Sequence, residues 1–159
     1  MDKRERSILA LTSSAHCLTH LAAGYYPGIV EPLRAEFGLN FAQAAELAFP
    51  GYLAFGICAL PAGYLASKFS GRSLILIGKI IMAFSAFGAA SAQTPDQLMY
   101  WLLGLGIGAS IYHPVGYALL SNSVRARAHF SHLLFLMFDY CAIWRSKSLN
   151  QYWNEAFFY

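Results

Sequence analysis

Three histidines lie within long apolar stretches of the sequence, where titratable side chains are uncommon. His16 and His20 are four residues apart, so on a helix both would project from one face. His113 stands directly before Pro114, whose ring leaves one backbone carbonyl without its helical partner. Imidazoles exchange protons near neutral pH, and ionisable groups inside membrane segments usually mark functional sites. His16, His20 and His113 are therefore candidate binding residues; the alternative is a structural hydrogen bond to a neighbouring helix.

Two further side chains of the apolar stretches could serve a site or the membrane surface. Lys79 lies six residues into a stretch that begins at Ser73, about 9 Å deep in a helix. Its stem is long enough to reach the nearer membrane surface, so we expect it to snorkel to the cytoplasmic side. Tyr25 suits an interfacial aromatic belt, or alternatively a platform on which a sugar-like solute stacks.

The composition requires a lipid environment for the elements that position these residues. Hydrophobic residues make up 57% of the 159 positions and charged residues 12%, about half the share of a soluble domain. Low hydrophobicity and high net charge, which disorder needs, are both absent. The eleven Lys and Arg residues are spread over loops rather than gathered in a stripe, which argues against a nucleic-acid binder. The sequence predicts an all-α membrane protein.

Four stretches are long and apolar enough to cross a bilayer, which takes about 20 residues each. They cover residues 7–30, 43–66, 73–92 and 96–121, within a four-helix segment expected over residues 1–128. Pro50 and Pro61 should kink the second helix without excluding it, because neighbouring helices can satisfy freed backbone groups in a membrane. Gly104 and Gly108, four residues apart in the fourth helix, favour close helix packing.

Basic residues fall on one side of these four crossings. Seven of them precede the first helix, join the second to the third, or follow the fourth: Lys3, Arg4, Arg6, Lys68, Arg72, Arg125 and Arg127. The opposite side carries only Arg34 in its two loops. Because cytoplasmic loops are enriched in Lys and Arg, this pattern predicts a cytoplasmic N-terminus.

The loop between the second and third helices resembles the signature loop of the major facilitator superfamily. That pattern places glycine, a small residue, a basic residue, glycine and a basic residue where this sequence has Gly63, Ala66, Lys68, Gly71 and Arg72. At Ser67 the family usually has an aspartate that takes part in the inward–outward switch. With residues 36–39, 59–63 and 104–116, including Tyr112-His113-Pro114, the sequence resembles the fosmidomycin-resistance and sugar-transporter-like branches.

The resemblance implies the first four helices of a twelve-helix secondary transporter in the bacterial inner membrane. Helices 1 and 4 of the family line the central cavity, so His16, His20 and His113 become candidates for contacts with a small solute or a coupled proton. Gly63, Ser67, Lys68, Gly71 and Arg72 would form the conformational-switch loop. No Ser-His-Asp order, carboxylate pair or phosphate loop can be assembled from the residues and the eight acidic side chains, so we expect no enzyme activity, and we expect no cofactor and no metal.

The sequence changes character after Ala128, where the family would continue into a glycine-rich fifth helix. Residues 129–159 contain no glycine or proline, and ten of these 31 residues are aromatic. Residues 129–144 are a candidate for a partial or interfacial fifth helix. Truncation or a frameshift would explain the change, so we expect a truncated transporter that needs further helices or a partner chain. The alternatives are a membrane fragment or interaction module that transports nothing, and a haem-binding helical membrane protein with histidine ligands.

Overall fold

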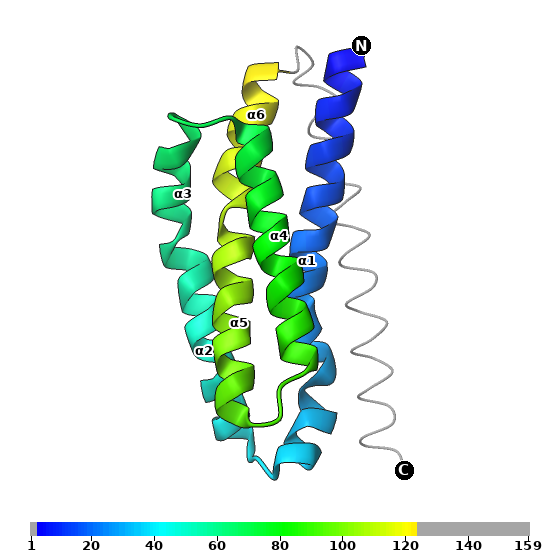
Figure 1. Cartoon of the computed structure of the whole chain (residues 1–159), viewed down its shortest axis with the longest axis vertical. Coiled ribbons are helices and arrows are strands. Elements are labelled where there is room, and N and C mark those ends of the chain that lie inside the picture. Colours follow the sequence, from blue (N-terminus) through cyan, green and yellow to red (C-terminus); the bar gives the residue numbers. More distant parts are fainter. Residues whose placement is uncertain (1–2, 124–159) are drawn as a thin grey trace. The chain divides into compact units, whose positions relative to one another are not determined.

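The computed structural model describes residues 3–123, and all regular structure in that range is helical. The tail over residues 129–159, with its candidate fifth helix, lies outside the described residues. The six helices are α1 (Lys3–Phe37), α2 (Phe41–Ile57), α3 (Ala59–Ala66), α4 (Gly71–Ala90), α5 (Pro95–Ser110) and α6 (Tyr112–Ser123). In Figure 1 the chain passes along α1, back through α2 and α3, forward again along α4, and back through α5 and α6. Consecutive passes are therefore antiparallel.

Local sequence signals explain where the passes begin. Asn40 caps α2 through a reciprocal pair of hydrogen bonds with Gln43, both 2.9 Å long. Thr94 caps α5, and Pro95 occupies its first turn, where a missing N–H costs nothing. Gly38, between α1 and α2, has a φ of 65°, a backbone conformation that glycine adopts without strain. The reversals between helices are thus encoded by a few residues at each end.

Prolines explain why two of the passes are divided. Pro61 cannot donate to the carbonyl of Ile57, and α2 ends at Ile57. Pro114 cannot donate to the carbonyl of Ser110, and α5 ends at Ser110. Pro50 lies inside α2 without dividing it.

Pro27 lies inside the unbroken helix α1, and a neighbouring helix satisfies the backbone group that it leaves open. The carbonyl four residues before Pro27 belongs to Ala23, and it accepts a hydrogen bond of 3.1 Å from the Tyr52 hydroxyl of α2. Compensation by a neighbouring helix is how membrane helices tolerate interior proline.

Glycines let α5 lie close to both α2 and α4. A Cβ at Gly51 would stand 2.6 Å from the Leu102 carbonyl oxygen, and one at Gly106 would overlap the carbonyl of Gly51. On the other side of α5, a Cβ at Gly108 would lie 2.8 Å from the carbonyl oxygen of Gly78. A Cβ at Gly104 would meet the Ser85 hydroxyl oxygen at 2.5 Å. Small residues at such crossings allow backbones to approach where no side chain would fit.

Within residues 3–123, three helical passes are long and apolar enough to cross a membrane: Phe41–Ala66, Gly71–Ala90 and Pro95–Asn122. The helix α1 spans 35 residues but is less apolar than these. Its buried residues include Thr12, His16 and Thr19, which turn polar groups toward the rest of the bundle. The polar face that lowers the hydropathy of α1 is the face that builds the site described below.

Two apolar cores hold the bundle together. One joins Ala15 of α1 to Leu74 and Ile75 of α4 and to Tyr112 and Val115 of α6. The other consists of Tyr26 of α1, Leu47 and Ala48 of α2, and Leu98 and Leu102 of α5. Along α1, His16 and His20 fall between the residues of the first core and Tyr26 of the second.

Candidate functional site

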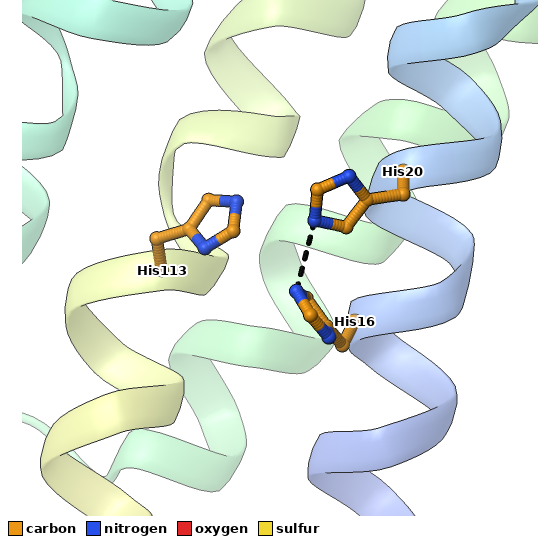
Figure 2. Close-up of side chains that lie close together, drawn as sticks. All are labelled: His16, His20 and His113. Carbon is orange, nitrogen blue, oxygen red and sulfur yellow. Dashed lines mark hydrogen bonds between the residues drawn. The ribbon is translucent and has the colours of Figure 1, made fainter. Parts of the chain in front are cut away.

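The three predicted histidines converge between α1 and α6 (Figure 2). The Nε2 atoms of His16 and His20 are 2.9 Å apart and share a hydrogen bond. The ring of His113 lies 5.6 Å, centroid to centroid, from each of the other two rings. His16 is buried, His20 is half-buried and His113 is exposed. The helix α1 therefore supplies the adjacent pair. His113 follows Ile111, where α5 and α6 are divided, and lies beside that pair.

Lys79 points toward this cluster, which contradicts the expectation that it snorkels to the cytoplasmic surface. Its Nζ donates a hydrogen bond of 2.5 Å to the Thr19 hydroxyl of α1 and approaches the Sδ of Met82 at 3.4 Å. It also lies 5.2 Å from the centroid of the Tyr112 ring, within the range of a cation–π contact. Depth along the helix made snorkelling possible, but a polar acceptor and an aromatic face on neighbouring helices draw the side chain inward.

Tyr112 fixes the position of the cluster by contacts at both ends of its side chain. Its hydroxyl donates a hydrogen bond of 2.7 Å to the Thr12 carbonyl of α1, and its ring stacks on His16 with centroids 5.4 Å apart. Thr19 is held in turn by a 2.8 Å hydrogen bond from its hydroxyl to the carbonyl of Ala15. The imidazoles and the Lys79 ammonium thus stand on a buried framework shared by α1, α4 and α6.

A small cavity of about 80 Å³ opens among α1, α2 and α5. Its walls are apolar and aromatic, and include Tyr26, Tyr52 and Phe55. Phe55 connects the cavity to the polar cluster, since its ring lies 5.7 Å from that of His113. Apolar walls beside a few convergent polar groups are typical of small-molecule sites, but those sites usually enclose about 300–1,000 Å³, so this cavity alone holds at most a very small ligand.

Tyr25, the remaining candidate, is 41% exposed and does not line this cavity. The adjacent Tyr26 lines it instead and donates a hydrogen bond of 2.6 Å to the Ala44 carbonyl. Side chains at neighbouring positions of a helix point about 100° apart, so the packing of α2 decides whether Tyr25 or Tyr26 lines the cavity. The sequence of α1 alone does not determine that packing.

The predicted switch loop joins α3 to α4 and is held by local contacts. Ser67 ends α3, and its hydroxyl donates a 2.7 Å hydrogen bond to the Tyr64 carbonyl. Lys68 places its Nζ 5.8 Å from the centroid of the Tyr64 ring. A Cβ at Gly63 or Gly71 would meet side chains of α6 at 3.5–3.6 Å, so both glycines lie against that helix. Arg72 is exposed in the first turn of α4.

Apolar passes with polar side chains gathered inside them define a polytopic helical membrane protein. Comparison with known proteins identifies its kind: the sequence profile of the Major Facilitator Superfamily matches residues 12–132. The chain belongs to the major facilitator superfamily. The prediction of an all-α membrane bundle of this family is confirmed, and the family points to a transporter rather than an enzyme.

Two curated relatives are transporters or resistance proteins. An uncharacterized MFS-type transporter, YwoD of Bacillus subtilis, is 28% identical over 128 residues, which cover 80% of this chain and 28% of YwoD. The multidrug resistance protein MdtL of Shewanella oneidensis is 32% identical over 91 residues, which cover 57% of this chain and 23% of MdtL. The chain thus spans about a quarter of the length of these relatives. No solved structure matches it.

Proposed function

We propose that the chain forms part of a secondary transporter that moves a small solute across the bacterial inner membrane. The observation that carries this proposal is the group of His16, His20, His113 and Lys79 inside otherwise apolar passes. Burying such groups in a bilayer costs free energy, and polar residues retained there usually bind a solute or carry a proton. Alternating access around a fixed polar site is the mechanism that this arrangement supports.

In this proposal the histidines bind solute and exchange the coupled proton. His113 is exposed and stands at the mouth of the site, so it contacts the solute first, and His20 lies beside it. His16, buried behind them, shares a hydrogen bond with His20 and can pass a proton to it. The helix α1 is the first of four crossings, with a cytoplasmic N-terminus as the loop charges predict.

Transport requires more helices around the site than residues 3–123 supply. Because His113 is exposed in this bundle, further helices, from the same polypeptide or a second one, must cover the site during the cycle. Gly63 of α3 and Gly71 of α4 lie against α6, and the segment between them, with Ser67, Lys68 and the adjacent Arg72, would couple the movement of α6 to that of α4. The chain itself is proposed to bind solute and to transport only when those helices are present.

The experiment that tests this proposal is a binding screen with the full chain in detergent micelles. The resemblances to the fosmidomycin-resistance and sugar-transporter-like branches, together with the name of MdtL, define the panel: phosphonates, sugars and drugs. Binding is read first as a rise in the midpoint of thermal unfolding and then as a Kd from titration calorimetry. We expect at least one class of compound to bind.

Variants then locate the bound compound. His113→Gln and His20→Gln should weaken its binding by about tenfold, the effect of losing one hydrogen bond to a charged or strongly polar partner. Cys17→Ser, an exposed position of the same helix, is the matched control and should bind normally. A folded chain that binds no member of the panel, or binds one equally well in all variants, would contradict the proposal.

A further inference from the structure

The spacing of the histidine nitrogens suits a metal ion. Two nitrogens that each bind one Zn²⁺ at about 2.1 Å lie about 3.0 Å apart when the N–Zn–N angle is a right angle, and about 3.4 Å apart when it is tetrahedral. The Nε2 atoms of His16 and His20 are 2.9 Å apart and face one another. A histidine pair four residues apart on a helix is also the ligand spacing of many helical zinc sites.

The third imidazole lies within reach of the same point. One ligand nitrogen from each of His16, His20 and His113 can be chosen so that all three lie within 4.8 Å of one another (Figure 2). A shift of about 1.5 Å by His113 would bring its nitrogen to a coordinating distance. Because this side chain is exposed, such a shift needs no repacking of the core.

We propose that His16, His20 and His113 form a binding site for a divalent transition-metal ion of the Zn²⁺ class. Imidazole nitrogens favour zinc, copper and nickel over magnesium and calcium, which prefer oxygen ligands. Three protein ligands leave a fourth position on the exposed side of His113, where water or an anionic group of a solute can bind. The same imidazole nitrogens cannot bind a metal ion and a proton at once, so the metal site is proposed independently of the transport function above.

The surroundings orient one ligand and oppose the charge of the ion. Tyr112 stacks on His16 and is itself held by Thr12, so the His16 ring enters the site pre-oriented. Lys79 of the neighbouring helix α4 donates its Nζ hydrogen bond to the Thr19 hydroxyl, and within residues 3–123 no carboxylate pairs with it. A cation bound at the histidines and the Lys79 ammonium repel one another. Removing the lysine charge should therefore strengthen metal binding.

The test is a titration of the full, metal-free chain in micelles with Co²⁺, followed by displacement with Zn²⁺. Tetrahedral nitrogen coordination of Co²⁺ gives intense visible absorption, which reports both occupancy and geometry. We expect one equivalent of Co²⁺ to develop this absorption and one equivalent of Zn²⁺ to abolish it.

Variants distinguish the proposed ligands from other binding groups. His16→Gln, His20→Gln and His113→Gln should each weaken Zn²⁺ binding by about tenfold or more, by loss of one of three ligands. The double variant His129→Gln/His132→Gln removes the two other histidines of the chain and should bind Zn²⁺ as the natural chain does. Lys79→Met should tighten binding about threefold or more, because it removes a nearby positive charge.

A measurement on the natural chain covers the case in which a variant does not fold. Diethyl pyrocarbonate modifies exposed imidazoles, and mass spectrometry of peptides shows which ones. Zn²⁺ should protect His20 and His113, the two members of the cluster that are not buried. Unchanged reactivity at both, or Co²⁺ binding of undiminished affinity in His113→Gln, would overturn the metal site.

Discussion

Replacing Gly51 by alanine should destabilise the bundle, whereas the same replacement at Gly56 should not. Both glycines lie in α2, and neither has a positive φ. At Gly51 the new Cβ would stand 2.6 Å from the Leu102 carbonyl oxygen, whereas ordinary contact begins at 3.4 Å. The helices α2 and α5 would have to separate locally by about 0.8 Å, and overpacking of this kind costs about 1–3 kcal/mol.

Gly56 is the matched control because a Cβ there meets nothing within 4 Å. Alanine favours a helix over glycine by up to about 1 kcal/mol, and both variants gain this term. The difference between them therefore isolates the steric cost. We expect Gly51→Ala to be less stable than Gly56→Ala by about 1–3 kcal/mol, which corresponds to a roughly 5- to 150-fold change in the unfolding equilibrium.

Reversible unfolding in mixed micelles of increasing dodecyl sulfate content, followed by circular dichroism, measures this difference. The helical signal should be lost at a lower dodecyl sulfate fraction in Gly51→Ala than in Gly56→Ala. Equal midpoints for the two variants would refute the reasoning, because they would show that α2 and α5 do not approach closely at Gly51.

Two further predictions concern the orientation of the chain and the framework of the site. The first uses single cysteines in a chain whose natural cysteines, Cys17, Cys58 and Cys141, are replaced by serine. A membrane-impermeant maleimide added to intact bacteria should label Glu36→Cys and Asp96→Cys, and should reach Ser70→Cys only after lysis. The reverse pattern would contradict a cytoplasmic N-terminus. Tyr112→Phe loses the 2.7 Å hydrogen bond to the Thr12 carbonyl and should lower stability in the same micelle titration by about 1 kcal/mol. Tyr64→Phe, at a 66% exposed position of α3, is its control and should change little; equal losses would refute a stabilising role for the Tyr112 hydroxyl.

The helical passes could be predicted from the sequence because composition and length suffice for them. Apolar runs bounded by charge and turn residues indicated the pass now divided into α2 and α3, and the one divided into α5 and α6. The helix α1 extends beyond the apolar run over residues 7–30 at both ends. Lys, Arg and Glu end an apolar run, but they have high helix propensity and so continue the helix. The sequence predicts kinks at both Pro50 and Pro61, and of these two prolines Pro61 accompanies a division of the pass whereas Pro50 lies inside α2.

The site was partly predictable for a similar reason. His16 and His20 share a helix face by spacing alone, so their proximity follows from α1 forming at all. The contacts of Lys79 with Thr19 and Tyr112 join residues 60 and 33 positions apart, and no local pattern encodes which neighbours surround a side chain. The close approach of Gly51 to Gly106 was missed for the same reason, because each glycine has meaning only opposite the other.

A solute can reach the histidine cluster only if the cluster faces an aqueous path rather than lipid. Cysteine accessibility tests this requirement of the proposed function most directly. His113 and Phe87 are both exposed in this bundle, but Phe87, 78% exposed on α4, should face lipid. In a chain without its natural cysteines, His113→Cys and Phe87→Cys are treated in membranes with a small, charged methanethiosulfonate, which reacts only with thiols that water reaches. We expect rapid modification at position 113 and none at position 87. Equal protection of both positions would contradict it.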